Sequence, residues 1–295
     1  MAKRTKRQSI TIIGAGKLAS ALAVLLPKAG FAIDEIVTRR ALKGREKEIG
    51  RKSGGRLRTI ESAEWKSNVV WLAVSDSAIA SCAQTIAALT DWRGKTVVHF
   101  SGALSSDALG ALRRRGARVA SAHPMMSFVA GEPPSLSGVV WTVEGDAGAV
   151  TVARSIIKSL GGTALNINKK DKPLYHAFGA FLSPLLVVHL ETAMQLALEA
   201  GIPRRELAPL MRPIVERTLN NLFSNVKHDK GSGRAFSGPL IRGDIETIEG
   251  HLEALANMPA ALGLYVALIS AALQSELPVK NRAEIGNAIG RFLRQ

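Results

Sequence analysis

The sequence is poor in cysteine, in aromatic residues and in acidic residues. Cys82 is the single cysteine among 295 residues, and aromatic residues make up 5% of the chain. One cysteine excludes an intrachain disulfide framework and a thiolate-ligated metal cluster, and it is typical of a reducing compartment. We therefore expect a cytoplasmic protein.

The sequence also lacks a long hydrophobic run. Its most membrane-like stretch, residues 259–273, is interrupted by Gly263 and Ser270 and is shorter than the roughly 18–20 residues that a spanning helix needs. The basic N-terminus (MAKRTKRQS) leads directly into a strand-like segment, without the apolar core of a signal peptide. We expect no membrane partner.

Several catalytic signatures are absent. The sequence has no H-x-x-x-H, H-E-x-x-H, G-x-x-x-x-G-K-[ST] or G-x-S-x-G motif in a usable context. Zinc hydrolases, P-loop nucleotide hydrolases and serine hydrolases therefore lack support, and we predict no metal site.

Positive charge is abundant, with 39 Lys and Arg against 24 Asp and Glu. Residues 1–60 hold fifteen of these basic residues against four acidic ones. Such a surface can be merely solvated, or it can attract nucleic acid, an acidic membrane or a phosphorylated small molecule. Because no nucleic-acid-binding signature is present and aromatic residues that could stack on bases are few, we predict no nucleic-acid partner.

The first half of the chain alternates short apolar runs with helical patterns. Near-continuous runs such as VVWLAV and TVVHF are typical of a parallel sheet that is covered on both faces. This alternation predicts an α/β fold, namely an N-terminal Rossmann domain with a doubly wound, mostly parallel sheet. The expected strands are 9–13, 33–38, 69–74, 96–101, 118–122, 139–144 and 163–167.

The pattern changes near residue 168. Beyond Asp171 the apolar spacing is helical throughout, so we predict an all-α C-terminal domain. The first helix is expected to start at Asp171, to kink at Pro184 and to end at Gly201. The predicted domains are 1–168 and 169–295.

The first strand ends in a glycine-rich turn, G-A-G-K-L-A, from Gly14 to Ala19. Placed between an apolar strand and an amphipathic helix, this spacing is typical of a dinucleotide site, with the pyrophosphate at the helix N-terminus. The alternative is a structural turn without a ligand. The predicted cofactor-binding residues of the turn are Gly14, Ala15, Gly16, Lys17 and Leu18.

The second strand ends in Thr38, Arg39 and Arg40. An NAD site would place Asp or Glu here for the ribose 2′-hydroxyl, whereas a hydroxyl and guanidinium groups suit a 2′-phosphate. We therefore predict NADP, with NAD less favoured; exposed arginines without a ligand are the alternative. Val74 and Ser75, at the end of a later strand, are expected beside the nicotinamide, and Ser75 or Asp76 caps the next helix.

Two further strands end in polar residues at the same sheet edge. Ser101 and His123 are expected to converge beside the nicotinamide, where imidazole can exchange a proton during hydride transfer. His99, inside its strand, is interpreted as a core residue. The alternative for Ser101 and for His123 is a structural residue whose hydrogen bonds are all made within the protein.

Polar residues also share one face at the start of the long helix. Lys172, His176 and Ser183 alternate there with small residues, which makes a surface that a substrate can approach. First-turn solvation for Lys172 and a helix–helix hydrogen bond for His176 are the alternatives. Tyr175 is interpreted as a packing residue. The predicted catalytic residues are His123, Ser101, Lys172 and His176.

The segments GAGKLA, LAVSD, HFSGA, SAHPMMSF, WTVEGD and SGPLIRGD, with the K-x-x-Y-H-A helix start, resemble the Rossmann-like/DUF2520 proteins. These form a branch of the 6-phosphogluconate dehydrogenase-like superfamily, beside pyrroline-5-carboxylate reductases and prephenate dehydrogenases. The resemblance implies an NAD(P)-binding domain and a helical domain that forms homodimers, with the active site between domains.

The resemblance also bears on individual residues. Ser101 and His123 match the serine and the histidine of the HP motif in prephenate dehydrogenases, and Lys172 loosely resembles the catalytic lysine of 3-hydroxyacid dehydrogenases. Pro184 is a departure, because DUF2520 sequences commonly carry Asn there; a substrate contact from this part of the helix is therefore in doubt.

Together, these features predict an NADP-dependent oxidoreductase that transfers hydride between nicotinamide and a small carbonyl, hydroxy or imine substrate. The alternative is an NADP-binding sensor or regulatory protein without catalysis. The expected partners are a small-molecule substrate and a second copy of the chain, bound through the helical domain.

Overall fold

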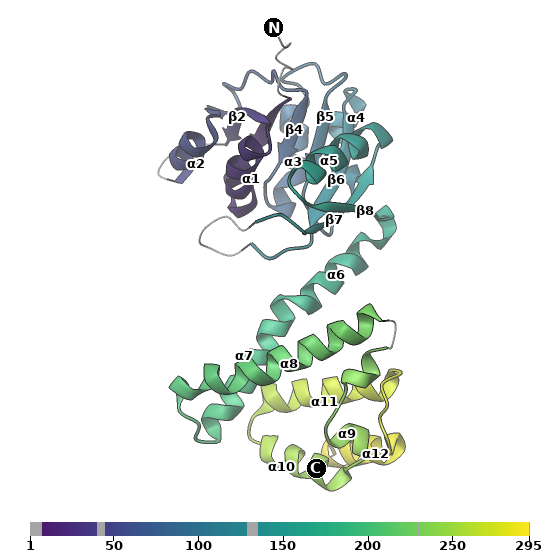
Figure 1. The fold of residues 1–295 in the computed structure, drawn as a ribbon. Helices are drawn as coiled ribbons and strands as arrows, with labels where there is room; N and C mark the ends of the chain where they lie inside the picture. Colours follow the sequence, from purple (N-terminus) through teal and green to yellow (C-terminus); the bar gives the residue numbers. More distant parts are fainter. Residues whose placement is uncertain (1–7, 40–44, 129–134, 229–230, 295) are drawn as a thin grey trace. The chain divides into compact units, whose positions relative to one another are not determined.

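The computed structural model describes residues 8–39, 45–128, 135–228 and 231–294, and of residues 45–48 only the backbone. The chain divides into two compact units, Met1–Ser183 and Pro184–Gln295, and each is described by itself. Figure 1 names the elements of both.

The first unit is built on an eight-stranded sheet of order β3-β2-β1-β4-β5-β6-β7-β8. All neighbouring strands are parallel except β6 and β7, which are antiparallel. The chain changes direction across the sheet between β1 and β4, and open α/β sheets bind ligands at such a switch point. The strands are β1 (Ser9–Ile13), β2 (Ala32–Thr38), β3 (Arg56–Thr59), β4 (Val69–Leu72), β5 (Thr96–His99), β6 (Arg118–Pro124), β7 (Val140–Gly145) and β8 (Thr163–Asn166).

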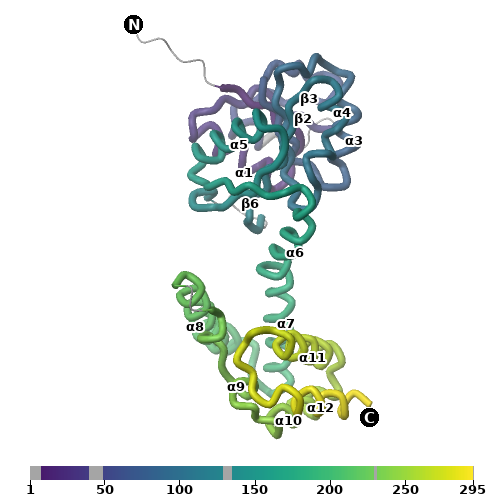
Figure 2. Tube along the Cα trace, turned by 90° about the vertical axis from the view of Figure 1, so that its right-hand side faces the viewer, coloured from purple at the N-terminus to yellow at the C-terminus, as the bar shows by residue number. Residues whose placement is uncertain are grey.

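Helices cover both faces of this sheet (Figure 2). One hydrophobic core joins the sheet to α1 and α5, through residues such as Leu22 and Ile156. A second core joins it to α3 and α4, through Ile79 and Leu112. The helices of this unit are α1 (Lys17–Lys28), α2 (Arg45–Ser53), α3 (Asp76–Ile86), α4 (Gly110–Arg114), α5 (Ala147–Ser159) and α6 (Lys172–Leu182), with 3-10 turns at Ser106–Leu109 and Lys169–Asp171.

The second unit is helical throughout its described residues. Its core gathers Ile248, Leu252, Ile269 and Ile285 from α10, α11 and α12. Asp244 caps α10 by accepting a hydrogen bond from the backbone N–H of Thr247. The helices are α7 (Pro184–Glu199), α8 (Leu207–Lys227), α9 (Pro239–Arg242), α10 (Ile245–Leu255), α11 (Pro259–Gln274) and α12 (Arg282–Phe292), with 3-10 turns at Arg204–Glu206 and Ser232–Ala235.

The predicted fold is confirmed: a doubly wound, mostly parallel sheet is followed by a helical region. Two elements of the first unit, α2 and β3, are additions that the sequence analysis does not place. The expected kink at Pro184 is a break at Ser183 that separates α6 from α7.

The end of the sheet and the end of the first unit do not coincide. The last strand ends at Asn166, close to the predicted boundary at 168, whereas the first unit extends to Ser183. It does so because Lys172 and Tyr175 of α6 bond to the sheet strands. The domains 1–168 and 169–295 stay a prediction.

The longest apolar helical segment is not the expected one. By length and composition alone, Lys169–Glu199 could cross a membrane, and none of its most apolar window is buried within the protein. Pro259–Gln274 is a shorter apolar helix. The prediction that residues 259–273 are the most membrane-like stretch is thus wrong. Taken together across the break at Ser183, α6 and α7 form a longer apolar segment. An apolar helix at a subunit interface meets the same test of length and composition.

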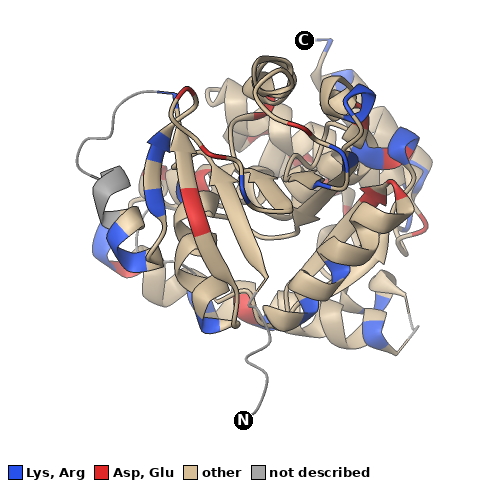
Figure 3. Ribbon diagram, turned by 90° about the horizontal axis from the view of Figure 1, so that it is seen from above, with Lys and Arg blue, Asp and Glu red and all other residues tan. Residues whose placement is uncertain are grey.

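Basic residues lie on many elements of the described chain (Figure 3). Several of them pair with acidic neighbours at the surface, as Arg113 does with Asp107 and Asp146. In the described residues this distribution is the one expected of a solvated basic surface.

Candidate active site

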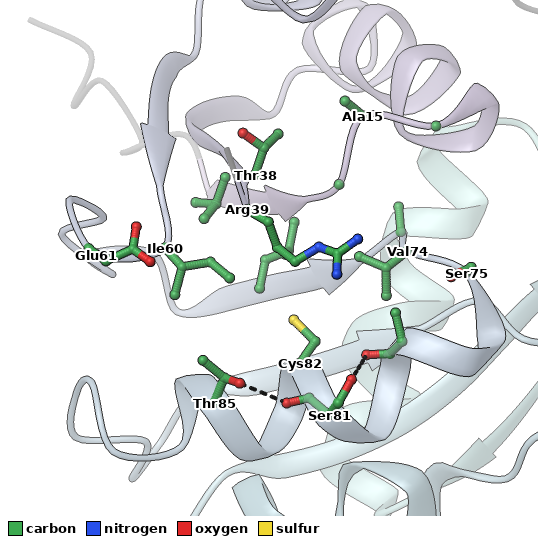
Figure 4. A pocket seen from close by; sticks show the side chains of 16 residues that line it. Ala15, Thr38, Arg39, Ile60, Glu61, Val74, Ser75, Ser81, Cys82 and Thr85 are labelled. Atoms are coloured by element: carbon green, nitrogen blue, oxygen red, sulfur yellow. Dashed lines mark hydrogen bonds between the residues drawn. The ribbon is translucent and has the colours of Figure 1, made fainter. Parts of the chain in front are cut away.

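A pocket of about 850 Å³ opens at the carboxyl ends of β1, β2 and β4 (Figure 4). It therefore lies at the switch point of the sheet. The lining residues are Ile13, Gly14, Ala15, Gly16, Val37, Thr38, Arg39, Ile60, Glu61, Ala73, Val74, Ser75, Ala78, Ser81, Cys82 and Thr85.

Gly14 lies where the chain leaves β1, and a side chain there would collide with the backbone. Its φ is +111°, and an added Cβ would lie 2.3 Å from the carbonyl oxygen of Ala73. Gly16 is the N-cap of α1 and provides no side-chain cap, and the first turn of α1 holds no acidic residue. Uncapped N–H groups and the helix dipole favour an anion at this end. A dinucleotide pyrophosphate fits this cradle.

The other predicted residues of the turn divide into two groups. Ala15 lines the pocket with Gly14 and Gly16, whereas Lys17 and Leu18 begin α1 outside the lining. Leu18 packs against the hydrophobic core instead. A contact of these two residues with a cofactor stays a prediction.

The end of β2 carries the charge of the pocket. Thr38 and Arg39 both line it, and the exposed Arg39 side chain extends across it above Cys82 toward Val74 (Figure 4). Arg40 lies outside the described residues. Val74 and Ser75, predicted beside the nicotinamide, line the pocket as well.

Asp76 differs from its expected role. Ser75 occupies the N-cap of α3, whereas Asp76 lies in the first turn and accepts a hydrogen bond of 2.6 Å from Ser101 Oγ. Of the two expected caps, Ser75 holds the N-cap position and Asp76 does not, and the Asp76 carboxylate joins the first turn of α3 to the turn after β5.

The hydroxyl of Ser101 is fully engaged. It donates its one proton to Asp76 and accepts the backbone N–H groups of Ala103 and Leu104, at 3.2 and 2.8 Å. The residue is 3% exposed. With its hydrogen-bonding capacity used inside the protein, Ser101 is placed to shape the turn after β5.

Lys172 is buried, although it begins a helix. Its exposure is 0%, and its Nζ donates to the carbonyl oxygen of Ser101 at 2.9 Å and to Ser121 Oγ at 2.8 Å. Burial lowers the pKa of the Lys172 ammonium to about 8, against the opposing effect of the Glu144 and Asp76 carboxylates. The ammonium thus places a positive charge beneath the ends of β5 and β6.

His123 lies at the end of β6 and is half-buried. Its Nδ1 is 3.0 Å from Tyr175 Oη, and its ring centroid is 6.1 Å from that of His176. Burial, followed by the charges of Lys172 and His176, lowers the pKa of His123 to about 4, while Asp76 acts in the opposite direction. The imidazole is therefore neutral at physiological pH.

Gly102 lies beside the imidazoles of His123 and His176, and its lack of a side chain leaves room for both rings. An added Cβ would lie 2.6 Å from His176 Cδ2 and 2.9 Å from His123 Nε2. The end of β5 thus brings Ser101, His123 and His176 around one turn, with Lys172 below it. Ser101 and His123, expected to converge, thus lie at one edge of the sheet, and Lys172 and His176, expected on one helical face, lie beside them; the chemical roles of all four stay predictions.

His99 provides a contrast within the same sheet. It is 0% exposed, as expected of a core residue, and its pKa is also lowered to about 4, mainly by burial. Its Nδ1 accepts the backbone N–H of Ser101, and its Nε2 is 3.0 Å from the carbonyl oxygen of Ser105. Both nitrogens of His99 are engaged by backbone, whereas Nε2 of His123 makes no hydrogen bond within the described part of the chain.

Sequence patterns do not identify several residues of the site. Tyr175 is interpreted from the sequence as a packing residue, but it lies three positions after Lys172, and this i, i+3 spacing on one helical face is the signal that could identify it. Glu61 and Cys82 line the pocket from a loop and from α3, and no motif marks them. Within the described ranges, no group of three or more His, Cys, Asp or Glu side chains could hold a metal ion.

Comparisons with known proteins agree with this architecture. Residues 2–124 match the model of a Rossmann-like domain, and residues 139–272 match the domain of unknown function DUF2520. No curated protein matches the chain.

Solved structures share the fold at low sequence identity. A proposed NADP oxidoreductase from Bacteroides fragilis is 22% identical with a TM-score of 0.70, covering 89% of this chain and 96% of its own. An imine reductase from Myxococcus stipitatus, in complex with NADP+, is 16% identical with a TM-score of 0.69, covering 97% and 99%. A reductive aminase from Aspergillus terreus, in complex with NADPH and ethyl-5-oxohexanoate, is 19% identical with a TM-score of 0.68, covering 96% and 99%.

The first model ends with β6, and the second begins with β7 and extends into the helical unit. The chain thus carries a Rossmann-like domain followed by the domain DUF2520.

Proposed function

We propose that this protein is an NADP-dependent oxidoreductase that transfers hydride between nicotinamide and a small carbonyl, hydroxy or imine substrate. The observation that carries the proposal is the spatial order of the binding and proton-exchanging groups along the edge of the sheet. A glycine cradle at β1 and Arg39 at β2 suit the adenosine half of a dinucleotide, and a neutral imidazole lies two strands beyond β4. The cofactor complexes among the structural neighbours support the same cofactor class.

The preference for NADP rests on Arg39. Its guanidinium is a planar, charged donor that matches a 2′-phosphate, and Thr38 adds a hydroxyl at the same strand end. Glu61 lines the pocket too, and its carboxylate would accept from a ribose hydroxyl as in NAD sites. We therefore expect a preference and not an absolute discrimination.

Each residue of the sheet edge has a role in this proposal. When bound, the nicotinamide supplies or accepts the hydride. His123 exchanges the proton with the substrate, and the exposed His176 is placed to bind the same group. Ser101 fixes the turn, and Lys172 adds positive charge that stabilises negative charge developing on the substrate.

The second unit supports a homodimer. Neither α7 nor the α8 residues beyond Leu207 are buried within the protein. Leu210 and Ile214 on one face of α8, and Phe223 and Val226 on another face further along it, are 55–66% exposed; exposed apolar side chains of this kind are typical of interfaces. We propose that a second copy of the chain covers them, and that the protein works in the cytoplasm. Sedimentation as a monomer at micromolar concentration would contradict the dimer, and recovery of the full-length protein only with detergent would point to a membrane instead.

The experiment that tests the cofactor is calorimetric titration with NADPH and NADH. NADPH should bind at least ~10-fold more tightly, a difference of about 1.4 kcal/mol. Arg39→Gln should remove most of this preference while NADH affinity stays within about twofold; Arg115→Gln, outside the pocket lining, is the matched control. Binding of neither dinucleotide would sink the proposal.

Cys82 offers an independent readout. It is the single cysteine, it lines the pocket, and burial raises the pKa of its thiol to about 11. Saturating NADPH should therefore slow its alkylation at alkaline pH in the wild type. An unchanged rate would place the cofactor elsewhere.

Turnover separates the enzyme from the sensor. Loss of NADPH absorbance with members of a panel of imines, keto acids and aldehydes, abolished in His123→Asn with NADPH binding intact, is the expected result. Tight binding with no turnover on any of them would favour the regulatory alternative.

A further inference from the structure

The proposed function gives His123 a role but none to Tyr175, to which His123 is hydrogen-bonded. Oη of Tyr175, in the first turns of α6, is 3.0 Å from His123 Nδ1 at the end of β6. The two rings meet edge to face, with centroids 5.6 Å apart and planes at 86°. A pair drawn from two separate elements fixes the orientation of the imidazole.

Which nitrogen of His123 carries its proton depends on the direction of this bond. A neutral imidazole holds one proton, so Nε2 presents a donor if Tyr175 donates to Nδ1, and an acceptor if Nδ1 donates to Tyr175. The lowered pKa of His123 makes the neutral ring the relevant species.

The chemistry of the two groups indicates the direction. A phenol O–H is a stronger proton donor than a neutral imidazole N–H, and an imidazole nitrogen is a stronger acceptor than a phenol oxygen, so Tyr175 donates to Nδ1. Thr142 lies directly opposite His123 in the antiparallel ladder of β6 and β7 and is 7% exposed, and its Oγ1 is buried with no hydrogen-bond partner within the described residues. A buried O–H left without an acceptor is costly. A Tyr175 oxygen whose own proton goes to Nδ1 stays open as an acceptor for Thr142.

We propose that Thr142 and Tyr175 act as positioning residues that hold His123 in the Nε2–H tautomer, so that the site offers a proton donor to a C=O or C=N group. The substrate side of this inference rests on the proposed function, whereas the tautomer itself does not.

The surroundings of Nε2 agree with a donor that awaits a substrate. Nε2 lies against Gly102, where no side chain intervenes, and beside the ring of His176. His99 shows the other outcome, because its Nε2 is already bonded to a backbone carbonyl.

The proton balance closes within the triad and solvent. As the substrate carbon gains hydride, the Nε2–H bond breaks and an O–H or N–H bond forms on the substrate. The Tyr175 Oη–H bond breaks and an Nδ1–H bond forms, which returns His123 to neutrality. A proton from solvent then forms a new Nε2–H bond while the Nδ1–H bond breaks and its proton returns to the tyrosinate, which restores the starting tautomer of His123 and the neutral Tyr175.

The test is the protonation of the imidazole nitrogens, read by nitrogen NMR on histidine-labelled full-length protein at neutral pH. His99 is the internal reference, since its Nδ1 accepts a backbone N–H and must leave the proton on Nε2. We expect the His123 resonances, assigned with His123→Asn, to show the same pattern. An Nδ1–H pattern would overturn the proposal.

Two variants sharpen this test. Tyr175→Phe should convert His123 to a mixture of tautomers, and Thr142→Val, which keeps shape and burial, should produce a smaller shift in the same direction. Tyr265→Phe removes the similar Oη–Nδ1 bond to His251, 2.8 Å long, in the second unit and should leave His123 unchanged. An unaltered tautomer in both Tyr175→Phe and Thr142→Val would also refute the assignment.

The kinetics of Tyr175→Phe provide a second test. With a substrate in hand, Tyr175→Phe should lower kcat about 10-fold or more with little change in KM or NADPH affinity, but it should have no further effect in a His123→Asn background. Failure of the wild type to bind NADPH would reject the proposed function and leave the tautomer result standing, so the two failures are distinguishable.

Discussion

The layers around the sheet and the helices that follow them differ in how they bury apolar residues. Around the sheet, all four tryptophans, Trp65, Trp71, Trp92 and Trp141, are at most 3% exposed. In α6, at the end of the first unit, Phe178 and Phe181 are 53% and 71% exposed, and in the second unit α7 buries no residue and α8 buries only Leu207. The difference indicates that the sheet and its covering helices are complete as one chain, whereas α6, α7 and α8 have surface suited to another copy.

The largest expected effect tests the completeness of the first unit. Trp71→Ala should lower the free energy of unfolding of this unit by about 3–5 kcal/mol, because it removes a 1%-exposed indole that meets Phe100 edge to face at 5.1 Å. Tryptophan fluorescence reports this unit alone, since the other three indoles lie there too. The midpoint in urea should not depend on protein concentration.

Trp71→Phe is the control for that prediction. The Nε1 of Trp71 is buried without a hydrogen-bond partner among the described residues, so replacement by phenylalanine loses volume but also an unsatisfied donor. We expect a loss of less than half of that seen for Trp71→Ala. Equal losses would mean that the aromatic contacts do not carry the stability.

Acid should weaken the first unit through its two buried histidines. The folded pKa values of His99 and His123 are both lowered to about 4 from an unfolded value near 6.5. The unfolded state therefore takes up protons first, so this stability is complete above pH 6.5 and falls as the pH decreases toward 4, by on the order of 1–3 kcal/mol per histidine.

Urea unfolding of the wild type and of His123→Asn at neutral pH and at about pH 4.5 measures this contribution. The wild type should lose more stability between the two pH values than the variant does. Parallel losses would show that His123 is not held neutral by burial.

A charge on α8 should test whether this helix forms the interface with a second copy. Ile214→Glu places a carboxylate on a helix where Ile214 is 66% exposed in a single chain, and it should weaken self-association by at least ~30-fold, about 2 kcal/mol. Ile214→Leu is the matched control. Analytical ultracentrifugation should detect the dissociation, while tryptophan fluorescence of the first unit stays unchanged; equal association of both variants would exclude α8 from the interface.

The smallest expected effect concerns one charge inside the first unit. Lys172→Met removes the ammonium that, after burial, is the next cause of the lowered pKa of His123. The pKa of His123 should therefore rise, although burial keeps it below 6.5. Titration of the His123 ring protons by NMR checks this, with Lys170→Met as the control; an unchanged or lower pKa would contradict the buried positive charge.

Sequence patterns predict most of the sheet because apolar runs of strand length are frequent in it. They miss β3 and α2 for a physical reason: Arg56–Thr59 is a charged strand at the edge of the sheet, and Arg45–Ser53 has too few apolar residues to show a helical stripe. The antiparallel direction of β7 leaves no trace in its composition, since buried strands of either direction are apolar.

The site could be predicted in part because strand ends meet at one edge. Gly14, Arg39 and Val74 follow from the fingerprint and from the order of the strands. Contacts between elements do not: the burial of Lys172 depends on Ser101 and Ser121 from two other strands, and the role of Tyr175 depends on its approach to His123. An aromatic residue at helical spacing packs in most proteins, so packing was the natural interpretation of Tyr175.

The antiparallel ladder of β6 and β7 ties the packing of the core to the arrangement of the sheet edge. Successive residues of β7 face opposite sides of the sheet, so Trp141 enters the hydrophobic core while Thr142 lies across from His123. A slip by one residue would exchange the two faces, so Trp141 would leave the core and Thr142 would leave the side of His123. The register that buries Trp141 is therefore also the one that sets Thr142 opposite His123.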